Sequence, residues 1–202
     1  MKALRPVRDV SHFPTITFGS RSLMWWGTLG FMTIEGWTTG LIVVAYLYLR
    51  QNYTAWPPLR TPYPSLIAPS INLALMFLSL IPTTLAARAG QRLDLAGVKR
   101  WLLMTSVVSV PIVVIRWWEL WAIGTRWDTN AYGSAAWTIV GFHTSLILLD
   151  VAETLGLTAM FWLKRLPMSS YSDTNDNTFY WYFTVAIWVP IYLIVYVGPR
   201  IL

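Results

Sequence analysis

The 202-residue sequence contains no cysteine and only two histidines. Without cysteine the chain has no disulfides, no thiolate metal ligands and no thiol chemistry. Charged residues are also scarce at 12% of the chain, about half the share of an ordinary globular protein. So little charge argues against a soluble domain and directs attention to the hydrophobic stretches.

Apolar residues make up 55% of the sequence and gather in long runs. A helix needs about 20 largely apolar residues to cross a bilayer, and such segments must satisfy their backbone groups internally. Five stretches meet this length, at residues 23–49, 65–87, 97–123, 134–163 and 178–197. The sequence therefore predicts an all-α polytopic bundle, with one transmembrane domain over 23–202 after a tail over 1–22.

Two connections between these spans have a distinctive composition. Residues 56–64 are rich in proline, which fixes φ and predicts a rigid first loop. Residues 169–177 are polar and predict a loop before the last helix, with three candidate helix caps, Asp173, Asp176 and Asn177. Three prolines fall inside spans and predict kinks there: Pro82, Pro111 and Pro190.

The net charge of +6 reflects topology rather than nucleic-acid binding, because the basic residues flank spans and form no continuous stripe. Ten Lys and Arg residues lie on the N-terminal side of the spans and four on the other side, with Arg116 inside a span. This bias predicts a cytoplasmic N-terminus and an external C-terminus. No apolar run precedes Leu23, so the tail is not expected to be a signal peptide.

Four acidic residues fall inside spans: Glu35, Glu119, Asp150 and Glu153. Because charge is costly at bilayer depth, each is expected to be neutral, paired, or turned toward protein or water. Glu35 lies near the middle of the first helix. A neutral carboxyl that bonds between helices is favoured there over a proton-handling role, since the sequence shows no chain of partners around it.

Spacing along the helices gives the expected neighbours of the other polar residues. Glu119 follows Arg116 by three residues, which predicts an intrahelical ion pair near the outer interface. His143 and Asp150 are seven residues apart, so they share a face but stand about 10 Å apart. Asp150 and Glu153 are neighbours at i, i+3 and are expected to share a proton or find a cation.

The ligand inventory excludes redox centres on this chain. His12 lies in the basic tail, which leaves His143 as the single histidine at membrane depth. A membrane b-type haem usually takes two histidines and copper sites take several, so no metal or cofactor is expected here. If the protein serves a respiratory enzyme, electrons travel through another chain.

Five blocks in chain order carry a more specific signal: the segment at 25–50 with its mid-helix Glu35, NLALMFLSL at 72–80, RWWELW at 116–121, GFHTSLILLDVAETL at 141–155, and the aromatic-rich segment at 176–200. Together they resemble the cytochrome c oxidase subunit III family. The matching motif positions are Trp26, Gly27, Asn72, Ser79, Trp181, Trp188 and Tyr192.

The sequence departs from the family pattern in identifiable ways. The first two helices of the seven-helix form are absent, as in short bacterial members. Leu146 and Ile147 stand where the family's second histidine motif falls, Asp150 replaces a common glycine, and Tyr182 replaces a histidine after the tryptophan. Leu73 and Leu80 replace a threonine and a serine of the second block.

The resemblance implies a subunit without redox centres and without a catalytic site of its own. Such a subunit would pack beside subunits I and II of a haem–copper oxidase in the bacterial cytoplasmic membrane. Haem and copper would reside on the partner, and phospholipid would bind this chain. The family supports proton uptake by the catalytic subunit. The candidate residues for that role or for interhelical contacts are Glu35, Glu119, His143, Asp150 and Glu153.

Two alternatives remain at this point. One is an accessory subunit of a nitric oxide reductase from the same superfamily, which the sequence does not separate from an oxidase. The other is an independent membrane enzyme or transporter built on Glu35, Asp150 and Glu153. An odd number of spans without inverted repeats argues against many transporter designs.

Overall fold

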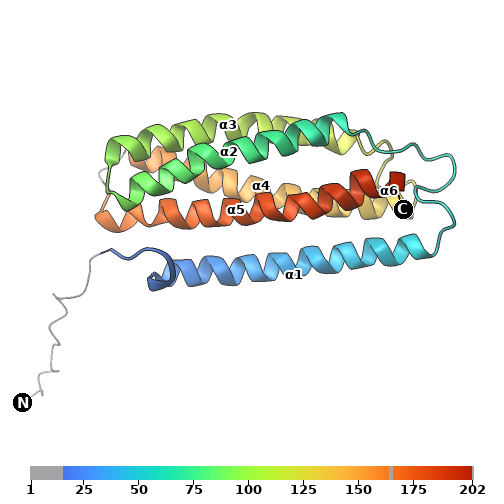
Figure 1. The fold of residues 1–202 in the computed structure, drawn as a ribbon, viewed down its shortest axis with the longest axis horizontal. Coiled ribbons are helices and arrows are strands. Elements are labelled where there is room, and N and C mark those ends of the chain that lie inside the picture. Colours follow the sequence, from blue (N-terminus) through green and yellow to red (C-terminus); the bar gives the residue numbers. More distant parts are fainter. Residues whose placement is uncertain (1–15, 164–165, 202) are drawn as a thin grey trace, which may run out of the picture.

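The computed structural model describes residues 16–163 and 166–201, so the basic tail with His12, and the pair Lys164 and Arg165, lie outside the described residues. Five long helices run alongside one another and alternate in direction (Figure 1). They are α1 (Leu23–Gln51), α2 (Ile67–Gln91), α3 (Leu95–Trp121), α4 (Ala131–Leu163) and α5 (Asp173–Tyr192). Each is long and apolar enough to cross a membrane, α5 together with its flanking turns, which confirms the all-α bundle.

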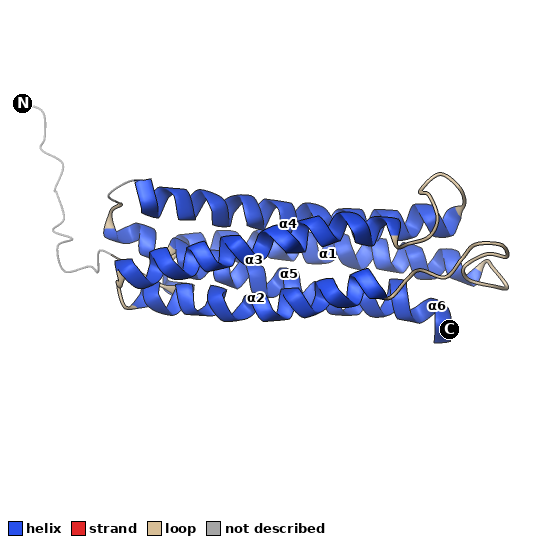
Figure 2. Ribbon diagram, turned by 90° about the horizontal axis from the view of Figure 1, so that it is seen from above, coloured by secondary structure: helices blue, strands red, loops and turns tan. Residues whose placement is uncertain are grey.

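Four of the helices form a closed bundle and the fifth docks against it. Contacts join α2 to α3 and α5, and α4 to α3 and α5, so these four complete a ring. The main contacts of α1 are with α4 and α5, and it lies along one side of the bundle in Figure 1. The N-terminal part of α1, the α2–α3 turn and the start of α5 share one end of the molecule. The α1–α2 and α3–α4 connections share the other, hereafter the loop end (Figure 2).

The docking face of α1 is a narrow stripe. Its buried residues are Met32, Glu35, Thr39 and Tyr46, at the three- and four-residue spacing of one helical face. The remainder of α1 presents large apolar side chains such as Trp37, which is 72% exposed. In a membrane this outer surface meets lipid or another subunit rather than water.

Local sequence signals fix several helix ends. The Asp94 carboxylate accepts a hydrogen bond from the Gly97 amide at 3.0 Å and caps α3. The Asn130 side chain accepts from the Gly133 amide at 2.8 Å before α4. Near the end of α2, a Cβ at Gly90 would lie 2.2 Å from Thr174 Oγ1, so only glycine lets α2 and α5 approach this closely.

The last helix begins earlier than the sequence indicated. A 3₁₀ turn covers Met168–Tyr171 and α5 starts at Asp173, so the prediction of a loop through 169–177 is wrong. Asp173 and Asp176 lie in the first turn of α5, where acids favour the helix dipole, rather than capping it from outside. The polar residues of this turn bond to other helices. Thr178, for example, donates to the Thr83 carbonyl at 3.1 Å.

The prolines expected inside spans are accommodated within helices. Pro82 lies in α2, Pro111 in α3 and Pro190 in α5. After Pro190 the last helix changes to a π-helical turn, Leu193–Val197, and ends in the short α6, Gly198–Ile201. The main core of the bundle lies around Trp188, which is fully buried among α2, α3 and α4 residues.

Candidate functional site

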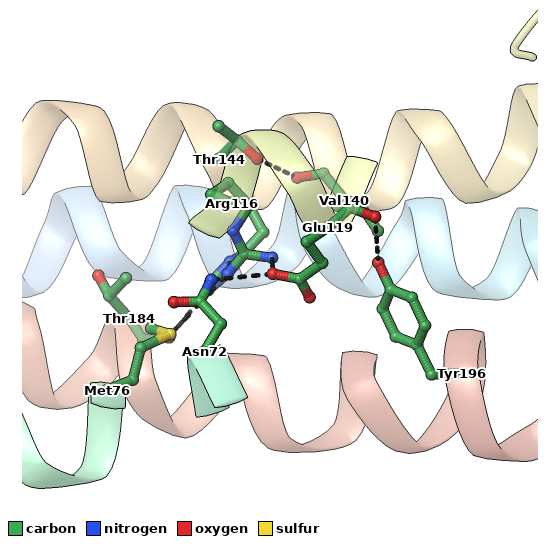
Figure 3. Close-up of polar contacts among 9 residues, drawn as sticks. Asn72, Met76, Arg116, Glu119, Val140, Thr144, Thr184 and Tyr196 are labelled. Atoms are coloured by element: carbon green, nitrogen blue, oxygen red, sulfur yellow. Dashed lines mark hydrogen bonds and ion pairs between the residues drawn. The ribbon is translucent and has the colours of Figure 1, made fainter. Parts of the chain in front are cut away.

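The register of the four bundled helices brings a set of polar side chains together at the centre. The Arg116 network consists of Asn72 on α2, Arg116 and Glu119 on α3, His143 on α4, and Thr184 and Trp188 on α5 (Figure 3 labels Asn72, Arg116, Glu119 and Thr184). All six are at most 1% exposed. Such residues must find partners inside the protein because neither lipid nor a dry core solvates them.

An ion pair forms the middle of this network. Arg116 Nη1 lies 3.0 Å from Glu119 Oε2, and the same carboxylate oxygen accepts a 2.8 Å hydrogen bond from Asn72 Nδ2. The pairing expected from the i, i+3 spacing is therefore present. Both side chains are sealed within the bundle, and they lie in the last two turns of α3. An amide from α2 satisfies the carboxylate further, so the pair links two helices.

His143 extends the network to α4 and α5. Its Nε2 lies 3.0 Å from the Thr184 carbonyl oxygen, and its Nδ1 lies 3.3 Å from Arg116 Nη2. A carbonyl can only accept and a guanidinium can only donate. Both contacts are satisfied when the ring is neutral with its hydrogen on Nε2. The histidine thus acts as a connector whose two nitrogens are both engaged.

The indole ring of Trp188 packs against both Arg116 and His143. The Arg116 guanidinium carbon lies 3.8 Å from the Trp188 ring centroid, a cation–π contact, and the His143 ring stacks at 4.7 Å. Met76 adds a sulfur contact to Arg116 at 3.8 Å (Figure 3). The cation is therefore held by a carboxylate, an imidazole and an indole. These contacts hold the Arg116 guanidinium in one position, as expected for a charge with a structural role.

A second group of polar residues lies where α1 meets the bundle. The Glu35 cluster consists of Glu35 on α1, Asp150 and Glu153 on α4, and Asp176 and Tyr180 on α5. Tyr180 Oη donates to Glu35 Oε1 at 3.0 Å and so joins α1 to α5. Glu35 is 5% exposed, and its other carboxylate oxygen has no hydrogen-bond partner among the described residues.

Two further acids of the Glu35 cluster, Asp150 and Asp176, have buried carboxylate oxygens without partners in the described chain. Asp150 is 3% exposed and Asp176 4%, yet Asp150 Oδ1 and both Asp176 oxygens lack partners within the described chain. Glu153 lies three residues after Asp150 on α4 and is exposed. No described Arg or Lys is ion-paired to any of these acids. The cluster therefore has the chemistry to hold protons, unlike the Arg116 network.

The Glu35 cluster borders an open groove. Glu153 and Tyr180 line a cavity of about 400 Å³ together with Phe31 and Gly27 of α1. Deeper in, Thr154 and Asn177 exchange two hydrogen bonds, at 3.2 and 3.1 Å, and hold α4 to α5. The groove lies between α1 and the α4–α5 face, so the cluster can be reached from the side of the bundle.

Some of the family-motif residues are buried between helices and others lie at the surface. Trp181 donates to Ser79 Oγ at 2.8 Å, and the Tyr192 hydroxyl lies 2.8 Å from Ser70 Oγ, so these residues join α5 to α2. Trp26 is 55% exposed, donates a hydrogen bond to the nearby Ser20 carbonyl at 2.9 Å and packs edge-on against Trp25. The Cβ position of Gly27 meets nothing within 4 Å.

The sequence indicated which residues were polar and within the membrane, but not which of them meet. It treated Glu35 as solitary, whereas the fold places it against Tyr180 of α5, which donates a hydrogen bond to it. It gave no relation between His143 and Arg116, which the fold brings to 3.3 Å. The sequence did show that polar residues in the middle of a span must face protein rather than lipid. Predicting which of them meet requires knowing how the helices are arranged around one another.

Metal ligation is not offered by these groups. Within residues 16–163 and 166–201, no three or more His, Cys, Asp or Glu side chains are gathered in a way that could hold a metal ion. His143 would have to give up Thr184 or Arg116 to become a ligand.

Comparison with known proteins finds relatives that share one name. No family model matches the chain. Cytochrome c oxidase subunit 3 of Synechocystis sp. is 24% identical over 182 residues, covering 88% of this chain and 77% of that protein. The protein of the same name from Thermostichus vulcanus is 24% identical, covering 86% and 87%. A probable cytochrome c oxidase subunit 3 of Mycobacterium tuberculosis is 27% identical, covering 78% of each chain.

These similarities extend over nearly the whole bundle and agree with the five ordered sequence blocks and the five apolar helices. Over most of its length the chain is thus similar to proteins named cytochrome c oxidase subunit 3.

Proposed function

We propose that this chain is a non-catalytic, subunit III-like membrane subunit of a haem–copper terminal oxidase in aerobic respiration. The observation that carries the proposal is the match to proteins named cytochrome c oxidase subunit 3 over 78–88% of the chain. A multi-pass bundle of five apolar helices fits that role. The nitric oxide reductase alternative is not favoured, because the relatives are named as oxidase subunits.

The partners proposed are the catalytic subunit I and subunit II of the oxidase. Haem and copper would be bound by them rather than by this chain. Supporting this division, the single histidine of the spans is occupied at both ring nitrogens by Thr184 and Arg116. The broad exposed face of α1 offers apolar surface for subunit contact or lipid.

The contribution proposed for the Glu35 cluster is support of proton uptake by the catalytic subunit. Buried carboxyls without a compensating cation can take up and release protons, whereas the ion-paired Glu119 cannot do so without breaking its pair.

The location proposed is the bacterial cytoplasmic membrane. The N-terminus would be cytoplasmic, as the Lys and Arg bias predicts.

The test is purification of the tagged full chain from its native membrane in mild detergent. The proposal expects a co-purifying partner with a haem absorption spectrum and oxygen-consuming activity. Recovery of this chain without any haem-bearing partner would overturn the oxidase assignment. Recovery with a partner that reduces nitric oxide and not oxygen would transfer the chain to the alternative complex.

A further inference from the structure

The two connections at the loop end enclose a cavity that is separate from both polar groups described above. It measures about 490 Å³, a volume within the range of ligand-binding sites. Arg60, Thr61 and Pro62 of the α1–α2 connection supply one wall, and the α3–α4 connection with Trp121 and Trp137 supplies the other. Figure 2 shows both connections extending beyond the helix ends, so the cavity lies outside the apolar part of the bundle.

The two connections that form the cavity are bonded to each other. The Ser65 amide donates to the Ala122 carbonyl at 2.7 Å, and Asn130 Nδ2 donates to Thr61 Oγ1 at 2.9 Å. Because Thr61 accepts this bond, its own hydroxyl hydrogen remains available to donate into the cavity. The connections therefore form one preformed surface rather than two independent loops.

One basic residue on this surface is held in a strained conformation. Arg60 has φ 72, in the left-handed region that L-residues other than glycine adopt only at a cost. Backbone strain of this kind clusters at ligand clamps, active sites and switch regions. The Arg60 side chain is exposed and has no hydrogen bond or ion pair to any part of the chain that the structure describes. Its guanidinium is therefore available to a group from outside.

The charge of the loop end is positive. The two connections and the C-terminal residues beside them (Figure 1) contain four arginines and one acidic residue, Asp128, within the described ranges 50–66, 122–130 and 198–201. Asp128 bonds the guanidinium of Arg126, which also lines the cavity, at 2.8 and 3.0 Å. An exposed pair of this kind contributes little and leaves further N–H groups of the arginine able to donate. Such a surface attracts and orients an acidic partner.

Large apolar side chains flank the cavity on the same connections. Leu59 is 85% exposed and directly precedes Arg60, and Trp127 is 59% exposed and directly follows Arg126. Tyr63, in the first connection, is also 59% exposed. Aromatic residues and arginine are the types enriched at protein–protein interfaces and their hot spots. Because these residues stand on connections rather than on the outer face of a helix, contact with acyl chains does not account for them, and the composition favours a protein partner.

From this geometry we propose that the loop end docks an acidic segment of a protein domain that lies outside the membrane. A carboxylate of that segment enters the Arg60–Arg126 cavity, where the Arg60 guanidinium binds it through paired N–H donors and the Thr61 hydroxyl donates a further bond. Apolar side chains beside the carboxylate pack on Leu59 and Trp127. The site is independent of the oxidase assignment, since it needs only that the loop end faces water.

The first test measures binding of two fluorescent peptides to the purified full chain in neutral detergent by fluorescence polarisation. One is Leu-Glu-Tyr-Glu-Leu with blocked ends, and the other has glutamine in place of both glutamates. The acidic peptide is expected to bind about tenfold more tightly. Its dissociation constant should rise about tenfold in Arg60→Gln and about threefold in Arg126→Gln, whose guanidinium is shared with Asp128. Arg92→Gln removes an exposed arginine from the opposite end and should leave binding unchanged.

A further variant separates loss of the site from loss of the fold. Arg60→Gly relieves the left-handed backbone, so its thermal midpoint should equal or exceed that of the parent while binding of the acidic peptide falls. Equal binding of both peptides by the parent, or undiminished binding in Arg60→Gln, would overturn the proposal. Displacement of the acidic peptide by inorganic phosphate, beyond that caused by potassium chloride of the same ionic strength, would assign the cavity to a soluble anion and also overturn it.

The second test asks what occupies the site in the native membrane. Leu59→benzoylphenylalanine places a photoreactive group beside Arg60, and mass spectrometry after irradiation maps the residues that it captures. The expected adduct lies on a segment of another protein that carries Asp or Glu, and its yield should fall when Arg60→Gln is added. Adducts on lipid alone, on a segment without acidic residues, or in undiminished yield with Arg60→Gln would contradict the proposal.

Discussion

The Arg116 network and the Glu35 cluster are built from similar residue types but have opposite electrostatics. In the first, a cation, a carboxylate and a neutral imidazole are mutually satisfied within four helices. In the second, Glu35 accepts a hydrogen bond from Tyr180, and the buried acids Glu35, Asp150 and Asp176 keep carboxylate oxygens without partners in the described chain. The contrast indicates that closed pairing serves architecture, while uncompensated acids at a docking surface are available for function.

The largest expected effect comes from unpairing the closed network. Arg116→Met leaves Glu119 buried without a cation, which should lower the free energy of unfolding by about 3–5 kcal/mol. Denaturant unfolding of the purified chain in detergent measures this loss. The double variant Arg116→Met/Glu119→Gln removes both charges and should recover part of it. If the single variant unfolds like the parent, the pair does not organise the bundle.

Removing the connector between helices should have an intermediate effect. His143→Leu withdraws the acceptor for Arg116 and the donor to Thr184, at a cost of about 2 kcal/mol. Hydrogen exchange of the α4 and α5 amides should report faster opening. The matched control is Thr144→Val, because among the described residues the Thr144 hydroxyl bonds only to the Val140 carbonyl of its own helix (Figure 3). Equal effects in both variants would contradict the connector role.

A smaller effect is expected where α1 docks. Tyr180→Phe deletes the hydrogen bond to Glu35 and should destabilise the attachment of α1 by about 1 kcal/mol. Limited proteolysis in the α1–α2 connection should then proceed faster. Tyr63→Phe, at a 59% exposed tyrosine, should behave like the parent. Unaltered cleavage of Tyr180→Phe would mean that apolar contacts alone hold α1.

The smallest change in stability, and the most informative for function, is expected from Glu35→Gln. The amide oxygen still accepts from Tyr180, so the free energy of unfolding should change by less than about 1 kcal/mol. Within the oxidase complex, oxygen turnover or the number of turnovers before inactivation should fall. Asp94→Asn, at the exposed cap of α3, is the control. Unaltered turnover and durability would remove Glu35 from the functional residues.

The sequence predicted the five-helix fold because hydrophobic length is a local property that the bilayer enforces. The Arg116–Glu119 pair was predictable for the same reason, since i, i+3 neighbours meet on any helix. The contacts of His143 with Arg116, and of Glu35 with Tyr180, depend on how separate helices are ordered and rotated. The start of α5 was misplaced because its polar residues resemble a loop, whereas Thr178 and Asn177 bond to neighbouring helices.

The central proposal is that this chain serves an oxidase without carrying a redox centre. The most direct measurement is the visible absorption spectrum of the chain after separation from its haem-bearing partner. The account predicts no haem or copper bands in the isolated chain, with the full signal remaining on the partner. Haem or copper bound to the isolated chain at one equivalent would contradict it.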